Sequence, residues 1–135
     1  MLFAFVVATV HCHPYRYRPR VLTRLDPSHS GQFVYGLAVT RDRMYVARRP
    51  PLTEFNRIAV YSLSTEYKRL DDLHIYGLQY VTDLAADDNV LYIADPESGI
   101  VWRFVQDKTV SAEKWIRLEH VGNLSVTRTG QLVAL

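Results

Sequence analysis

The chain has 135 residues, 48% of them hydrophobic and 22% charged, which is typical of a folded domain with one sizeable core. It has 16 Lys and Arg residues and 14 Asp and Glu residues, so its net charge is +2. That charge is too small to create a strong field toward DNA or anionic lipid, and we expect neither as a partner. The run YRYRPR at 15–20 interleaves aromatic and basic residues as an RNA-binding surface can, but we interpret it as a solvated leader.

Residues 1–19 are predicted to form a leader. The first ten, MLFAFVVATV, are apolar but too short for a transmembrane helix, which needs about 20 residues. They suit the apolar region of a secretory signal with cleavage near Cys12, so we predict a secreted protein without a transmembrane segment. A buried strand in a cytoplasmic protein is the alternative. Cys12 is the only cysteine, so cysteine usage does not decide between the two compartments.

One sequence pattern occurs three times after the leader. Each copy contains an apolar segment, a polar turn and a second apolar segment. Leucines at the equivalent position, Leu37, Leu84 and Leu124, are separated by 47 and 40 residues. This spacing matches a four-stranded propeller blade, which spans roughly 40 to 50 residues. The copies read GLAVTRDRMYVA from residue 36, DLAADDNVLYIAD from residue 83 and NLSVTRTGQLVA from residue 123.

The apolar residues alternate with polar ones or form short runs, a pattern that predicts strands and no helix. Third strands are expected at 57–61 and 99–104, and outer fourth strands at 67–70 and 114–118. We therefore predict an all-β fold over residues 20–135, a partial β-propeller of about two and a half four-stranded antiparallel blades. The predicted blades are 33–79, 80–120 and 121–135, and the third is expected to be incomplete after two strands.

The segment LYIADPESGIVWRF, from Leu91 to Phe104, resembles the NHL-type repeat and its YWTD-like and WD40-like relatives. Such repeats have a strand that ends in Ala-Asp, a short loop and an aliphatic-rich strand. The first copy keeps MYVA from Met44 but has Arg48 where the family has Asp. The resemblance covers about residues 35–135. It implies a propeller that binds proteins or RNA on one face, or, in a minority of such proteins, a hydrolase or lyase with a metal in the central channel.

Two acidic residues occupy notable places in the second copy. Asp95 ends a predicted strand before Pro96, so its carboxylate is expected to cap the turn by accepting backbone N–H bonds, with ligand binding as the alternative. Asp83 enters the innermost strand, near the channel of a closed ring, where carboxylates can hold Ca²⁺. The equivalent residues Gly36 and Asn123 leave too few oxygen ligands. No metal site or cofactor is therefore predicted.

A long loop is predicted after the second strand of the first copy. It brings Arg48, Arg49, Phe55 and Arg57 together in the sequence. Loops on a rigid scaffold commonly carry recognition, and arginine with aromatic residues is enriched at interface hot spots. We predict these four residues as a contact surface for a protein partner, with a plain solvent loop as the alternative.

No catalytic residues are predicted. The sequence has no Gly-rich phosphate loop, no G-x-S-x-G elbow and no H-E-x-x-H. The cluster His11-Cys12-His13 lacks a second ligand pair at zinc spacing. The leading hypothesis is a non-catalytic propeller scaffold for protein–protein interaction. The alternative is a fragment of a propeller hydrolase or lactonase, which would require acidic or histidine residues on the inner strands of further blades.

Overall fold

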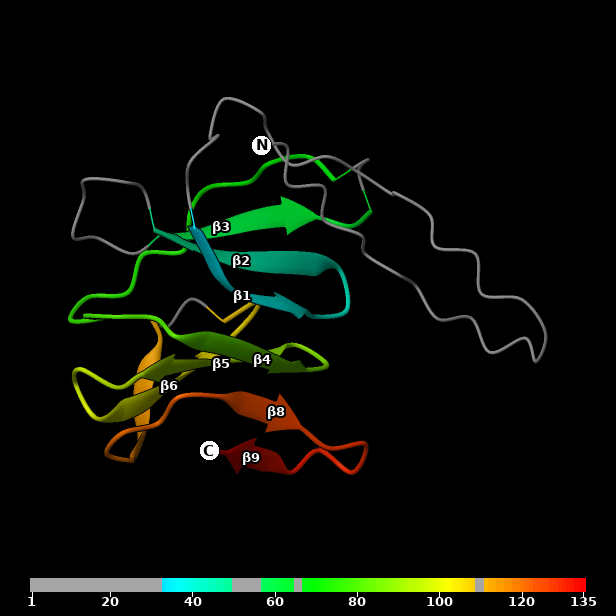
Figure 1. The fold of residues 1–135 in the computed structure, drawn as a ribbon. Coiled ribbons are helices and arrows are strands. Elements are labelled where there is room, and N and C mark those ends of the chain that lie inside the picture. Colours follow the sequence, from blue (N-terminus) through cyan, green and yellow to red (C-terminus); the bar gives the residue numbers. More distant parts are fainter. Residues whose placement is uncertain (1–32, 50–56, 65–66, 109–110) are drawn as a thin grey trace. The chain divides into compact units, whose positions relative to one another are not determined.

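The computed structural model describes residues 33–49, 57–64, 67–108 and 111–135. Within these residues it has nine strands, no helix, and three antiparallel sheets of three, four and two strands (Figure 1). The all-β prediction is thus confirmed. No helix in the described residues is long and apolar enough to cross a membrane. The predicted leader at 1–19 and the candidate contact residue Phe55 lie outside the described residues.

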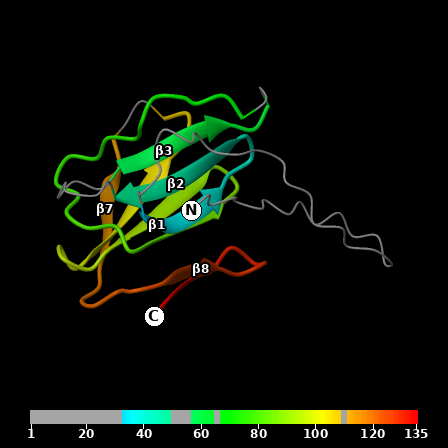
Figure 2. The ribbon, with the colours of Figure 1, turned by 45° about the horizontal axis from the view of Figure 1, so that its top comes forward.

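The first sheet has the order β1-β2-β3 and is rich in β-branched and aromatic residues, which suit a pleated surface packed on both sides. Thr40 closes the hairpin between the first two strands, because its amide N–H donates to the Arg43 carbonyl at 2.9 Å. Figure 2 shows the three strands side by side. Their bounds are Phe33–Val39 for β1, Arg43–Arg49 for β2 and Arg57–Ser62 for β3.

The predicted fourth strand at 67–70 is absent, and this part of the sequence prediction is wrong. The segment lies beside β3 without forming a regular strand: isolated bridges at Arg69 and Leu73 and a hydrogen bond from the Leu70 amide to the Val60 carbonyl at 2.9 Å join the two. Side chains that pack against the core recur along this segment at intervals of three, two and three residues, whereas a strand would bury every second one. They are Leu70, Leu73, Ile75 and Leu78.

The second sheet has the predicted four strands, in the order β4-β5-β6-β7. The turn between its first two strands places Asp88 at φ 48°, a left-handed conformation that Asp tolerates, and the next turn uses Gly99 at φ 65°. The outermost strand β7 is exposed along its whole length. The strands are Asp83–Asp87 for β4, Val90–Asp95 for β5, Ile100–Val105 for β6 and Glu113–Arg117 for β7.

The third sheet is a two-stranded hairpin of β8, Leu124–Val126, and β9, Leu132–Ala134. Its turn is closed by the Gly130 amide, which donates to the Thr127 carbonyl at 3.0 Å. The Leu135 amide and carbonyl bond the backbone of Asn123 and extend the pairing beyond the strands. The two strands predicted for the third copy are therefore present.

The first core lies between the first and second sheets, where β1 contacts β4. The first sheet contributes side chains that alternate along each strand and so share one face. The second sheet contributes mostly larger aliphatic side chains and one indole. The buried members are Ala38, Tyr45, Ala47, Ile58 and Val60 on one side, and Leu84, Leu91, Ile93 and Trp102, with Val81, on the other.

The second core lies between the second and third sheets, where β4 contacts β8. It uses the opposite face of the second sheet, at Ala85, Tyr92, Ala94 and Val101, against Leu124 and Val121. The residues Ala85, Tyr92 and Ala94 follow Ala38, Tyr45 and Ala47 of the first core at the repeat spacing of 47 residues. We call the contact between the first and second sheets the first junction, and that between the second and third sheets the second junction. Both use equivalent positions of the repeat.

Candidate functional site: an anchored loop and the contacts between sheets

Asp95, at the end of β5, is fully buried and accepts hydrogen bonds from three backbone amides. The amide of Gln79 lies 2.9 Å from one carboxylate oxygen, and the amides of Tyr80 and Ser98 lie 3.1 Å and 3.2 Å from the other. The Ser98 hydroxyl and the Trp102 indole N–H also donate to this carboxylate. The two bonds from Ser98 close the turn after β5, while the bonds from Gln79 and Tyr80 tie a separate loop to the second sheet.

The hydrogen bonds determine the protonation state of Asp95. Burial alone would raise the pKa of this carboxyl group. The bonds from Gln79, Ser98, Tyr80 and Trp102 outweigh burial and hold the pKa below its ordinary value. Asp95 is therefore ionised at neutral pH, and charge-assisted hydrogen bonds hold the loop in place.

The segment that Asp95 holds is the Tyr76 loop, residues 71–80. The Leu73 amide donates to the Ile58 carbonyl at 2.9 Å, and Leu73 packs against the first core. Between these anchors, Tyr76 is 100% exposed, and Gly77 adopts the turn conformation φ 88°. The loop thus presents one aromatic side chain to solvent from a backbone that is fixed on both sides.

Three residues of the predicted contact surface belong to strands, and the fourth, Phe55, lies outside the described residues. Arg48 belongs to β2, which extends two residues beyond the predicted MYVA segment, and is only 6% exposed. The prediction of Arg48 as an exposed loop contact is therefore wrong. Arg49 ends β2, and Arg57 begins β3 as an exposed residue directly opposite Arg48.

Asp83 connects two sheets. One carboxylate oxygen accepts the Leu124 amide N–H of β8 at 2.8 Å, and the other lies 2.8 Å from the Leu84 amide. Within the described residues, no three His, Cys, Asp or Glu side chains are grouped so that they could hold a metal ion. The observed role of Asp83 is therefore a bond across the second junction.

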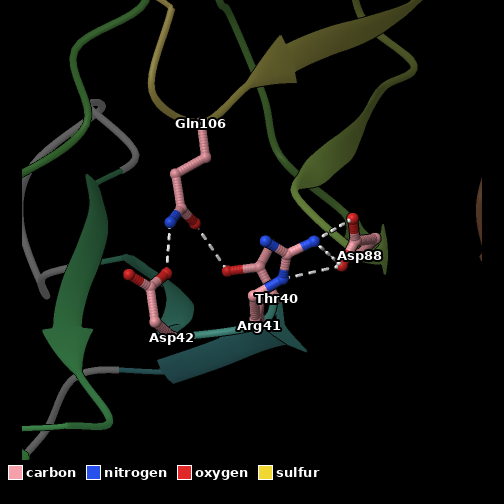
Figure 3. A network of polar contacts seen from close by, with 5 residues as sticks. All are labelled: Thr40, Arg41, Asp42, Asp88 and Gln106. Carbon is pink, nitrogen blue, oxygen red and sulfur yellow. Dashed lines mark hydrogen bonds and ion pairs between the residues drawn. The ribbon is translucent and has the colours of Figure 1, made fainter.

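A polar network joins the first and second sheets at the end opposite Asp95. The Gln106 carbonyl oxygen accepts the Thr40 hydroxyl at 2.7 Å, and its amide group donates to Asp42 (Figure 3). The same carbonyl oxygen accepts the Tyr45 hydroxyl at 3.2 Å. Burial raises the pKa of the Tyr45 phenol, which keeps that hydroxyl a neutral donor. Gln106 is itself buried, so the network satisfies a polar group that would otherwise be costly.

An ion pair lies beside this network. The Arg41 guanidinium donates to both carboxylate oxygens of Asp88, at 2.9 Å and 2.7 Å from one nitrogen (Figure 3). The Arg41 amide also donates to the Asp88 carbonyl at 2.8 Å. The two residues occupy the same turn position in consecutive repeats, so the pair joins equivalent turns.

Sequence reasoning missed Gln106 and Tyr76. Gln106 lies more than 60 residues from its side-chain partners, and no local motif marks it. Tyr76 carries a weak signal, because it lies between the apolar residues Ile75 and Leu78 and directly before a glycine. That arrangement is typical of a turn that exposes one residue.

Comparisons with known proteins assign no family to the chain. No protein-family model matches the sequence, and no curated protein matches it.

Proposed function

We propose that the three sheets are successive blades of an NHL-type β-propeller. The observation that supports this is the equivalence of the two junctions, in which Ala38, Tyr45 and Ala47 recur as Ala85, Tyr92 and Ala94. A stack in which each sheet buries its faces only against its neighbours is the arrangement of propeller blades. Closure of a ring would require further sheets.

We propose further that the protein is a non-catalytic scaffold that binds a protein partner through the Tyr76 loop. The observation that carries this proposal is the full exposure of Tyr76 on a loop held by Asp95. Tyrosine is enriched at binding hot spots, and a loop already fixed in its bound conformation loses little entropy on binding. Arg57 is exposed and is retained as a secondary contact candidate.

Site-specific photocrosslinking tests this function. A benzoylphenylalanine at position 76 is expected to capture a discrete partner, whereas the same group at Lys108, an exposed residue beyond β6, should not. With the purified partner, Tyr76→Ala should weaken binding at least about tenfold, since a hot-spot truncation costs about 2 kcal/mol or more. Equal crosslinking at both positions, or unchanged affinity of the Tyr76→Ala protein, would contradict the proposal.

A further inference from the structure

Two arginines converge on one buried phenol in the first sheet. The Arg48 guanidinium donates to the Tyr61 hydroxyl, and Arg69 Nη1 lies 3.4 Å from the same oxygen. Both guanidinium carbons also lie over the Tyr61 ring, at 5.6 Å and 5.4 Å from its centroid. Tyr61 is only 4% exposed, so two cationic groups meet at a site with little access to bulk water.

Among the described residues, positive charges outnumber the carboxylates that pair with them at this site. Asp72 pairs with Arg69, but in the described part of the chain no carboxylate pairs with Arg48 or with Arg57, which lies directly across the strands from Arg48. Like charges directly opposite on neighbouring strands are destabilising, and a buried cation is costly unless an anion compensates it. Among the described residues, one of the three guanidinium groups thus has a paired carboxylate.

We propose that Arg48 and Arg69 bind an oxyanion, a carboxylate or a phosphate group, beside the Tyr61 hydroxyl. The guanidinium group presents several N–H donors in a planar fork that suits the paired oxygens of both anions. The Arg69 side chain is 37% exposed and gives the anion a side of approach, while the buried Arg48 supplies a charge with which no described carboxylate pairs. This inference depends neither on the propeller assignment nor on the Tyr76 loop.

The test is a titration of the full chain with inorganic phosphate and, separately, with acetate, at constant ionic strength. Calorimetry is expected to show saturable binding of one of them, and the side-chain Nε–H resonance of Arg48 should shift with the same dissociation constant. The anion that binds more tightly assigns the ligand class. Arg69→Gln should weaken binding at least tenfold, whereas Arg103→Gln, which removes an arginine paired with Glu113 on the second sheet, should leave it unchanged.

Three results would overturn the proposal. They are the absence of saturable binding with either anion, binding that leaves the Arg48 resonance in place, and an Arg69→Gln protein with unchanged affinity. Arg69 is the preferred position for the variant because its side chain is partly exposed. A surface substitution of this kind leaves the buried part of the sheet intact.

Discussion

The two junctions between sheets use equivalent positions but differ in how they are held together. The first has a ten-residue buried core, the Gln106 network and the ion pair between Arg41 and Asp88. The second has a six-residue buried core and, in the described part of the chain, one side-chain hydrogen bond, which the Leu124 amide donates to Asp83. The same repeat therefore forms one strongly and one weakly connected junction.

The difference shows that repeats with the same strand arrangement can differ in the side chains that connect neighbouring sheets. On the third sheet only Leu124 is buried in the second core, whereas Val126, Leu132 and Ala134 are partly buried against it. Fewer buried contacts give a lower free energy of local opening. We therefore expect the third sheet to exchange its amide hydrogens faster than the first two.

The largest expected effect separates the two cores. Leu91 is fully buried in the first core, whereas Leu132, at the equivalent register position, is only partly buried against the second. Leu91→Ala should lower the free energy of unfolding by about 2–5 kcal/mol, and Leu132→Ala by clearly less, because less apolar surface and a smaller cavity are involved. Urea denaturation measures both, and equal losses would contradict the ranking of the two junctions.

The next effect concerns the anchor of the Tyr76 loop. Asp95→Asn should destabilise the protein by about 1.5–3 kcal/mol, since hydrogen bonds to a charged acceptor are replaced by weaker ones. The pKa of Asp95 is lowered by folding, so its contribution is present above the unfolded pKa of about 3.9 and is lost as pH falls through the folded pKa.

The stability difference between wild type and Asp95→Asn should therefore shrink in acid. Denaturation at pH 7 and at stepwise lower pH measures it, with the exposed Asp107→Asn as the control. A difference that stays constant with pH would show that the ionised carboxylate is not the anchor.

A smaller effect tests the close approach of β1 to β4. A Cβ on Gly36 would lie 2.7 Å from the backbone nitrogen of Leu84, so the strands must separate to admit it. Gly36→Ala should cost about 1–3 kcal/mol, as overpacking does. At Gly122 a Cβ would meet its nearest neighbour, the Leu135 carbonyl oxygen, at an ordinary 3.5 Å, so Gly122→Ala is the matched control and should change stability little.

The smallest effect is assigned to the ion pair between equivalent turns. The side chains of Arg41 and Asp88 are 72% and 57% exposed. A double-mutant cycle with alanine should give a coupling of about 0.2–1 kcal/mol that decreases with added salt. A larger coupling that salt does not change would mean that this pair, rather than the core and Gln106, holds the first junction.

The sequence was sufficient for the strands but not for the contacts between sheets. The period-two pattern and polar turns located the nine described strands, because backbone pairing within a hairpin is local. The strand at 67–70 was overpredicted because charged and apolar residues alternate there as on an exposed edge, although the segment forms only isolated bridges to β3. Arg48 was misplaced because strand ends are set by pairing with β3, which the sequence before the loop does not reveal.

The roles of Asp95 and Gln106 could not be predicted in full, because their hydrogen-bond partners are distant in the sequence. Asp95 was recognisable as a turn residue from Pro96, but its bonds to Gln79 and Tyr80 require the loop to return to the sheet. Gln106 had no local signal at all, since its partners come from another repeat. A buried polar side chain of this kind can be identified only once the sheets are packed together.

The most direct test of the stacked arrangement is a nuclear Overhauser measurement on the full chain. The account predicts a cross-peak between a Gly36 Hα and the Leu84 amide hydrogen, because the backbones of β1 and β4 approach closely at this point. This cross-peak, together with cross-peaks between the paired strands β4 and β5, would establish that β1 lies against β4 at the first junction. Its absence in a protein whose hairpins are otherwise formed would show that the sheets do not stack in this way, and would contradict the blade arrangement.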